Sequence, residues 1–277
     1  MVTRTTKSVS AWLRRLGFAA LLCLVLAPFM GVFLYMVSTS LQSPRDVSKP
    51  GLRLWFTPTL ENYRRVFLEN DIGAFALNSL VIATASTLLA LLLGAPAAFA
   101  LVHFKLTRMT VVILLTRVTP GITLLLPWFI LFTHLGWIDT YRALVLVHLV
   151  INLPLVIWML SNFLADVPRE LMEAARMDGA STQRAFVSVI MPTIRSGMAA
   201  VAILAFILSW NSFLFSIVLA VDRTRTLPVA AFNFMSYGSI EWGAITAVAV
   251  IMTLPVVILA LMAQRQIIAG LSGRIEV

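Results

Sequence analysis

Charged side chains are scarce in this sequence. Asp, Glu, Lys and Arg make up 12% of the 277 residues, whereas hydrophobic residues make up 60% and the mean hydropathy is +0.94. A soluble domain has about a quarter of its residues charged, so this chain cannot cover a globular surface with charge. We therefore expect an integral membrane protein in contact with the lipid bilayer. The net charge of +9 does not indicate nucleic acid as a partner, because cations gather in the cytoplasmic loops of membrane proteins.

Cysteine and histidine are also rare. The single cysteine, Cys23, excludes an intrachain disulfide, and the three histidines have no cysteine or carboxylate at metal-ligand spacing. A nucleotide-binding loop of the form G-x-x-x-x-G-K-[ST] does not occur. The sequence therefore predicts no catalytic residue, no metal site and no cofactor in this chain. Any ATP on which this chain depends is therefore expected to bind, with its Mg²⁺, to another subunit.

Six long segments contain no Asp, Glu, Lys or Arg. A helix needs about 20 apolar residues to cross the hydrocarbon core, and each segment is long enough. The expected fold is all-α, with six transmembrane helices. The third expected helix is the least regular, because it begins before its charge-free segment and so includes Arg117, and because it contains the Pro120-Gly121 pair. The expected helices lie near residues 16–38, 74–99, 110–133, 142–164, 197–221 and 243–264.

The first hydrophobic segment has an alternative interpretation as a signal peptide. Arg14 and Arg15 precede it, and the small residues Ser38, Thr39 and Ser40 follow it. The apolar run is longer than that of a typical signal peptide, which favours an uncleaved first helix.

The distribution of cations predicts that both termini are cytoplasmic. This topology places 12 Lys and Arg residues inside and 8 outside, with Arg117 within the third span. The chain then consists of a cytoplasmic tail at 1–15, a transmembrane domain at 16–264 and a second cytoplasmic tail at 265–277. The longest cytoplasmic connection is 165–196.

The connection at 165–196 begins with the pattern of a short helix. Asp166 or Val167 can cap it, Pro168 suits its first turn, and Gly179 can adopt the left-handed conformation that ends it. Small or apolar residues then share one face of this helix. They are Leu171, Ala174 and Ala175, with Asp178 one turn further on.

A second helix is expected after the glycine turn. Ser181 can cap it, and Pro192 is expected to end it after about Ile190. This helical pair is either a surface for a partner protein, since small side chains allow close approach, or an amphipathic connector lying on the bilayer.

The motif Glu173-Ala174-Ala175 is followed by Asp178-Gly179-Ala180, then by Phe186 and by Val189-Ile190-Met191-Pro192. This arrangement resembles the EAA loop of permease subunits of binding-protein-dependent ABC importers. The form E-A-A-x-x-D-G-A resembles the carbohydrate-importer branch, and more narrowly the maltose-type second permease. Ser196 stands where this family commonly has proline. Further similar features are Asn78-Ser79, Pro120-Gly121 with Pro127, residues 136–140, and Trp210-Asn211.

The resemblance implies a type I ABC importer permease in the bacterial inner membrane, where it spans the bilayer several times. Its implied partners are a second permease subunit, two copies of an ATPase subunit and an extracytoplasmic substrate-binding protein. The residues implied to couple the permease to the ATPase are Glu173, Ala174, Ala175, Asp178 and Gly179.

The outer loop at 222–242 is rich in aromatic residues. The resemblance implies that this loop contacts the binding protein, whereas the alternative is that its aromatic residues are anchors at the membrane interface. The implied contact residues are Phe232, Asn233, Phe234 and Tyr237.

Polar residues within the spans are candidates for the substrate pathway, because polar groups facing lipid are costly. An uncharged sugar or polyol needs hydrogen-bonding groups and an aromatic face. The alternative is that each residue forms a hydrogen bond between helices, and Arg117 can instead extend to the bilayer edge. The candidates are Arg117, Trp128, His148, Asn152, Asn211 and Ser212.

The predicted function is that of a permease subunit forming half of a pathway for a carbohydrate or polyol. One alternative is a stand-alone secondary transporter, which would require ionisable residues in mid-membrane for ion coupling. Only Arg117 and the histidines meet that requirement. A membrane anchor for a signalling complex is a third possibility, but it gives no role to the polar residues of the spans.

Overall fold

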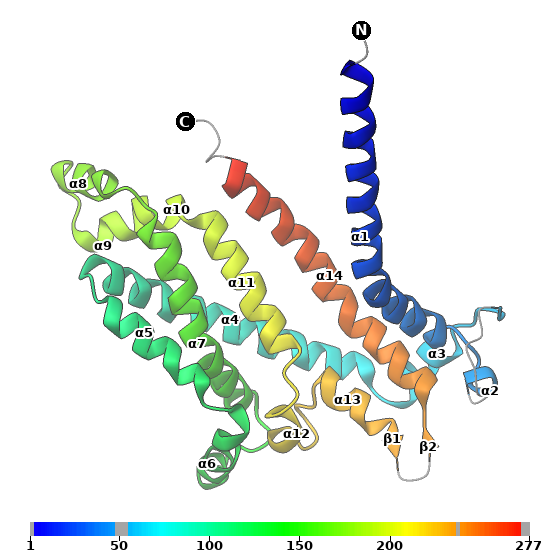
Figure 1. Cartoon of the computed structure of the whole chain (residues 1–277). Coiled ribbons are helices and arrows are strands. Elements are labelled where there is room, and N and C mark those ends of the chain that lie inside the picture. The colour runs from blue at the N-terminus through cyan, green and yellow to red at the C-terminus, as the bar shows by residue number, and fades with distance from the viewer. Residues whose placement is uncertain (1–2, 48–54, 237–238, 273–277) are drawn as a thin grey trace. The chain divides into compact units, whose positions relative to one another are not determined.

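The computed structural model describes residues 3–47, 55–236 and 239–272, which are almost entirely helical (Figure 1). The chain forms two compact units, which we describe separately. The first combines residues up to 70 with residues 234–250, and the second combines residues 71–233 with residues from 251 onward.

Four described helices are long and apolar enough to cross a membrane. They are α1 (Thr3–Ser40), α4 (Ile72–His103), α7 (Tyr141–Ala165) and α14 (Trp242–Ser272). The helices α1 and α14 extend into the segments expected to be tails, at 1–15 and 265–277. The all-α prediction is confirmed, and six spans result when each of two bent helix pairs is counted as one span.

The third expected span is not the continuous helix predicted over 110–133. The segment α5 (Thr107–Leu115) with η1 (Thr116–Val118) is followed by α6 (Gly121–His134) after a bend of 84°. Proline lacks an N–H and disfavours the helical conformation in the residue before it. Thr119 and Pro120 accordingly have ψ angles of 120° and 130°. Arg117 therefore does not share a helix face with Trp128.

The fifth expected span also differs from its prediction. Its helix α11 (Arg195–Trp210) ends well before residue 221. The Asn211 side chain donates a hydrogen bond to the Ile207 carbonyl over 2.9 Å, a local bond that competes with helix continuation. The chain resumes as the short α12 (Ser216–Leu219). Asn211 and Ser212 thus follow the helix end and do not lie midway along a helix.

The helical segment before α11 continues through Pro192, which was expected to end it. It consists of α9 (Thr182–Ala185), the π-helical η2 (Phe186–Ile190) and α10 (Met191–Thr193). A π-helical turn changes the backbone bonding pattern directly before the proline, which has no N–H to donate. The bend of 77° falls after Thr193, before α11.

The core of the second unit lies where α4, α7 and α11 pack together (Figure 1). Small residues on α4 recur every four positions at Ala90, Gly94 and Ala98, which allows the helix backbones to approach closely. A Cβ atom at Gly94 would lie 2.8 Å from Val156 Cγ1 of α7. Small residues on α4 therefore allow the large apolar side chains of α7 to pack against its backbone.

The first unit is held together by polar contacts around α3 (Glu61–Glu69). The buried Asn62 amide donates to the carbonyls of Ser40 and Gln42 over 3.0 and 2.7 Å. Arg65 pairs with Glu241 at 2.9 Å. The unit also contains α2 (Pro44–Val47) and a small antiparallel pair of strands, β1 (Met235–Ser236) and β2 (Ser239–Ile240).

Gly197 on α11 provides a test of the close packing. We expect Gly197→Leu to lower the thermal unfolding midpoint of the purified protein, because a Cβ atom there would lie 2.6 Å from the Phe163 ring. Overpacking of this kind costs about 1–3 kcal/mol. The control is Gly73→Leu on α4, where a Cβ atom meets nothing within 4 Å. Equal midpoints for the two variants would contradict the packing argument.

Candidate functional site

The loop between α7 and α11 contains the short helix α8 (Arg169–Met177), which is closed by a glycine turn. Gly179 has a φ angle of +80°, and its N–H donates to the Arg176 carbonyl over 3.0 Å. The Ala180 N–H donates to the Ala175 carbonyl over 2.9 Å. These two bonds define a Schellman motif. The predicted glycine end is confirmed, whereas Pro168 occupies the N-cap and not the first helical turn.

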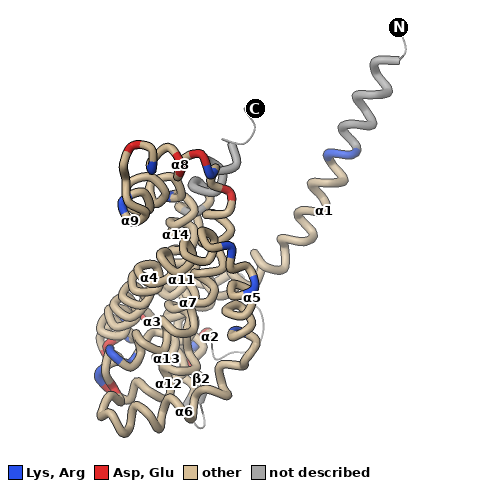
Figure 2. Tube along the Cα trace, turned by 90° about the vertical axis from the view of Figure 1, so that its left-hand side faces the viewer, with Lys and Arg blue, Asp and Glu red and all other residues tan. Residues whose placement is uncertain are grey.

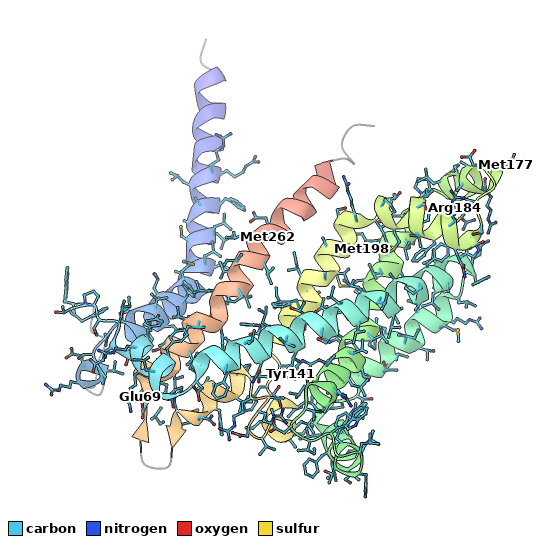
Figure 3. The ribbon with its side chains drawn as sticks, turned by 180° about the vertical axis from the view of Figure 1, so that it is seen from behind. Glu69, Tyr141, Met177, Arg184, Met198 and Met262 are labelled. Atoms are coloured by element: carbon cyan, nitrogen blue, oxygen red, sulfur yellow. The ribbon has the colours of Figure 1, made fainter. Side chains whose placement is uncertain are left out.

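The second helix of the loop, α9, begins as predicted. The Ser181 hydroxyl accepts a hydrogen bond from the Arg184 N–H over 3.3 Å, which caps the helix. Within the second unit, α8 packs against α9 and η2. Figure 3 shows Met177 and Arg184 together at one end of this unit, away from Tyr141 at the start of α7.

Four of the five predicted coupling residues are exposed. Glu173, Ala174, Asp178 and Gly179 all face outward. Ala175 is only 7% exposed, so its side chain faces its own subunit and is not available to a partner. The small Ala175 side chain allows α8 to pack closely on that subunit. Of the residues predicted to share one face of this helix, Leu171, Ala174 and Asp178 are therefore the accessible ones.

Charged residues of this unit gather on the same protrusion. Figure 2 marks the positions of acidic and basic residues along α8 and α9, whereas the central parts of α4, α7 and α11 carry none. Such a surface suits contact with water and with another protein. The protrusion therefore offers a polar docking surface outside the apolar spans.

Two predicted pathway residues form hydrogen bonds between helices. His148 Nδ1 lies 2.7 Å from the Ser209 hydroxyl, and Ser209 lies 3.0 Å from the Ser86 hydroxyl. The Asn152 amide donates to the Ala205 carbonyl over 3.3 Å. These residues join α4, α7 and α11, and His148 and Asn152 are each 3% exposed. The geometry thus agrees with the interhelical alternative for His148 and Asn152.

Ser209 is central to this network, because it contacts both His148 and Ser86. We expect Ser209→Ala to lower the unfolding midpoint, since it leaves the buried His148 Nδ1 unpaired, at a cost of about 1–3 kcal/mol. Ser86 keeps its bond to the Ala83 carbonyl. Substrate preference should not change, because the network is buried. Thermal unfolding and competition transport assays measure the two effects. A changed preference with a normal midpoint would return His148 to the pathway.

The six pathway candidates do not form one cluster. Arg117 and Asn211 are exposed, and Ser212 is half-buried. Trp128 stacks on Phe132 with ring centroids 5.1 Å apart. Sequence reasoning missed Ser86 and Ser209, although small hydroxyl residues within apolar spans could have indicated them.

The loop around residues 222–227 is anchored by two side chains of α4. The Asn78 amide donates to the carbonyls of Arg223 and Arg225 over 3.0 and 2.9 Å. Its Oδ1 atom accepts a hydrogen bond from the Tyr141 hydroxyl. The Ser79 hydroxyl accepts from the backbone N–H at position 227 over 2.9 Å. This loop is therefore held in a defined position before the chain enters α13 (Leu227–Asn233).

Asp139 is a further anchor of this loop. Its carboxylate accepts hydrogen bonds from the Arg223 N–H (2.9 Å), the Thr224 N–H (3.1 Å) and the Thr224 hydroxyl (2.9 Å). Burial raises the pKa of Asp139, but these hydrogen bonds and one from the Asp222 backbone outweigh it and leave the pKa below its ordinary 3.8. A lowered folded-state pKa means that this stabilisation is complete above the ordinary pKa and is lost as pH falls through the lowered one. Sequence reasoning assigned Asp139 no role.

The predicted contacts with a binding protein are only partly accessible. Phe232 is 49% exposed, and Asn233 is also exposed. The Phe232 ring packs against Phe213 at a centroid distance of 5.8 Å. Phe234 is 7% exposed, so its buried ring is not available as a contact. Tyr237 lies outside the described residues.

Comparison with known proteins identifies the family. Residues 86–272 match the family described as "Binding-protein-dependent transport system inner membrane component". The chain is 32% identical to a probable ABC transporter permease protein, y4oR, of Sinorhizobium fredii, over 96% of this chain and 97% of that protein. It is 35% identical to the trehalose transport system permease SugB of Mycobacterium tuberculosis, over 87% and 89% of the two chains. It is 33% identical to the trehalose/maltose permease MalG of Thermococcus litoralis, over 92% and 93%.

The fold is also found in a solved transporter structure. A chain of a bacterial ABC transporter that imports alginate superposes with a TM-score of 0.71 at 18% identity, covering 96% of this chain and 98% of that chain. Membership of this family excludes the alternative of a stand-alone secondary transporter, because its members are components of multi-subunit systems. The chain belongs to the inner membrane components of binding-protein-dependent transport systems and is a multi-pass permease subunit of an ABC transporter, distinct from the ATPase subunit.

Proposed function

We propose that this permease forms one half of the translocation pathway for a carbohydrate or polyol, together with a second permease subunit. The trehalose and maltose systems named for its relatives support a carbohydrate substrate. Two copies of an ATPase subunit bind ATP and Mg²⁺ and drive the pathway between inward-open and outward-open states. This chain supplies no residue to the hydrolysis reaction.

The exposed protrusion of α8, Gly179 and α9 is the observation that carries this proposal. In the proposed complex it lies on the cytoplasmic side, and α8 docks into a groove of the ATPase subunit. Ala174 gives a small side chain at the contact, and the Gly179 turn allows close approach. Glu173 adds a hydrogen bond or ion pair with a cationic group of the partner.

The outer loop is proposed to receive an extracytoplasmic substrate-binding protein. Phe232 and Asn233 are the accessible residues for this contact. Asn78 and Asp139 support it indirectly, because their hydrogen bonds fix the loop that leads into α13.

Reconstitution of the assembled transporter tests the proposed function. The permease is co-purified with its partner permease and ATPase and placed in liposomes with a binding protein loaded with a radiolabelled disaccharide. We expect uptake and ATP hydrolysis only when the loaded binding protein and ATP are both present. Uptake by this chain alone, driven by an ion gradient, would contradict the proposal.

A further inference from the structure

A cavity of about 360 Å³ lies between α8 and the adjoining ends of α4 and α7. Its inner wall is apolar and includes Phe99, Leu164 and Ile190. Its rim is cationic, with Lys105 after α4, and Arg169 and Arg176 on α8. The cavity therefore combines an apolar surface with three positively charged side chains.

One of the cations, Arg176, contacts the end of α4. Arg176 lies 3.4 Å from His103 Nε2. Arginine has no hydrogen-bond acceptor, so Arg176 is the donor. The His103 ring stacks on Phe99 with centroids 5.3 Å apart. Lys105 has a φ angle of 55° in the turn that closes α4. The rim thus includes a contact between α8 and the end of α4.

The lining of the cavity carries more positive than negative charge. Glu173 is the one carboxylate among its lining residues, against Lys105, Arg169 and Arg176, with His103 as the remaining titratable group. Within the part of the chain that the structure describes, none of the three cations forms an ion pair. An anionic group in the cavity would be stabilised by several charge-assisted contacts.

The position of the cavity indicates the source of this anion. The candidate spans Ile72–His103 and Tyr141–Ala165 both end at the cavity, which places it at the boundary between hydrocarbon and water. Basic pockets between transmembrane helices at the cytoplasmic boundary bind anionic lipid head groups. We propose that the cavity binds the head group of an anionic phospholipid, with the apolar wall contacting the start of its acyl chains.

A bound lipid would also affect α8. A lipid phosphate held by Arg169 and Arg176 would brace α8 against the end of α4. Anionic lipid should therefore raise substrate-stimulated ATP hydrolysis. This consequence rests on the proposed function, whereas lipid binding itself does not.

The test uses the whole transporter in nanodiscs of phosphatidylcholine with or without phosphatidylglycerol. Native mass spectrometry counts the phosphatidylglycerol molecules that stay bound when the transporter is released from the nanodiscs. We expect Arg169→Gln/Arg176→Gln to weaken this binding by about tenfold or more, since each cation near the surface contributes about 1 kcal/mol. The matched control is Arg108→Gln/Arg195→Gln, which removes two exposed cations outside the cavity and should bind as the wild type does.

The outcomes separate this proposal from the proposed function. Rescue of lipid binding by Arg169→Lys/Arg176→Lys would support it and exclude misfolding as the cause. The proposal would be overturned if the glutamine variant retained as much phosphatidylglycerol as the wild type. It would also be overturned if the wild type retained phosphatidylcholine as well as it retains phosphatidylglycerol. Displacement of the lipid by millimolar glycerol 3-phosphate would assign the cavity to a soluble anion and also overturn it. Normal lipid binding without ATPase coupling would contradict only the proposed function.

Discussion

Replacing Gly179 with Asp is expected to abolish most of the substrate-stimulated ATPase activity of the assembled transporter. The subunit itself has room for the new side chain, because a Cβ atom at Gly179 meets nothing within 4 Å. The left-handed φ of +80° costs a side chain on the order of 1 kcal/mol, and Asp tolerates this region better than most residues. Folding should therefore survive, and the loss should arise where the added bulk and charge meet the ATPase.

The measurement is ATP hydrolysis with and without loaded binding protein. A loss of about tenfold or more corresponds to docking weakened by 1.4 kcal/mol. The milder variant Glu173→Ala should reduce activity only slightly, because one exposed ionic contact is worth little. Membrane insertion and the unfolding midpoint of Gly179→Asp should remain near those of the wild type.

Gly136 provides a matched control for backbone strain. It has a φ of +64° and also meets nothing within 4 Å. Its N–H bonds to Thr133, and the next N–H, of Trp137, bonds to Phe132, which reproduces the Schellman motif. Gly136→Asp should retain ATPase coupling. Wild-type coupling in Gly179→Asp would instead favour a connector lying on the bilayer.

The long helices were predictable from the sequence because hydrophobic length is a strong, local property. The expected span at 142–164 agrees with α7 (Tyr141–Ala165) to within a residue at each end. The errors arose where one residue overrides the hydrophobic pattern. Pro120 breaks the third span, and the Asn211 side chain bonds to the end of α11.

The candidate site was predictable only in part. The glycine turn after α8 follows from local backbone chemistry, so Gly179 was placed correctly. The burial of Ala175 depends on how α8 packs against η2 and α9, which the period of a single helix does not reveal. The same applies to His148, whose partner Ser209 is 61 residues away in the chain. Pairing of distant residues also explains why Asp139 was missed.

Asn78 gives the second prediction with a large expected effect, because one side chain bonds to two carbonyls of the loop at 222–227 and to the Tyr141 hydroxyl of α7. Asn78 is 5% exposed. In Asn78→Leu, the carbonyls of Arg223 and Arg225 lose their donor and the Tyr141 hydroxyl loses its acceptor. These partners are partly exposed, so each lost hydrogen bond costs about 0.5–1.5 kcal/mol. We therefore expect the loop to open locally and transport to fall strongly.

Trypsin offers a direct measurement of this opening, since it cleaves after arginine and the loop contains Arg223 and Arg225. Cleavage requires local release of the backbone, so Asn78→Leu should be cut in this loop much faster than the wild type. Tyr141→Phe is the matched control, because it removes only one of the three hydrogen bonds and should raise the rate less than Asn78→Leu does. Uptake of substrate from saturating binding protein should decrease in the same order as cleavage increases. An unchanged cleavage rate in Asn78→Leu would show that Asp139 and Ser79 hold the loop without Asn78.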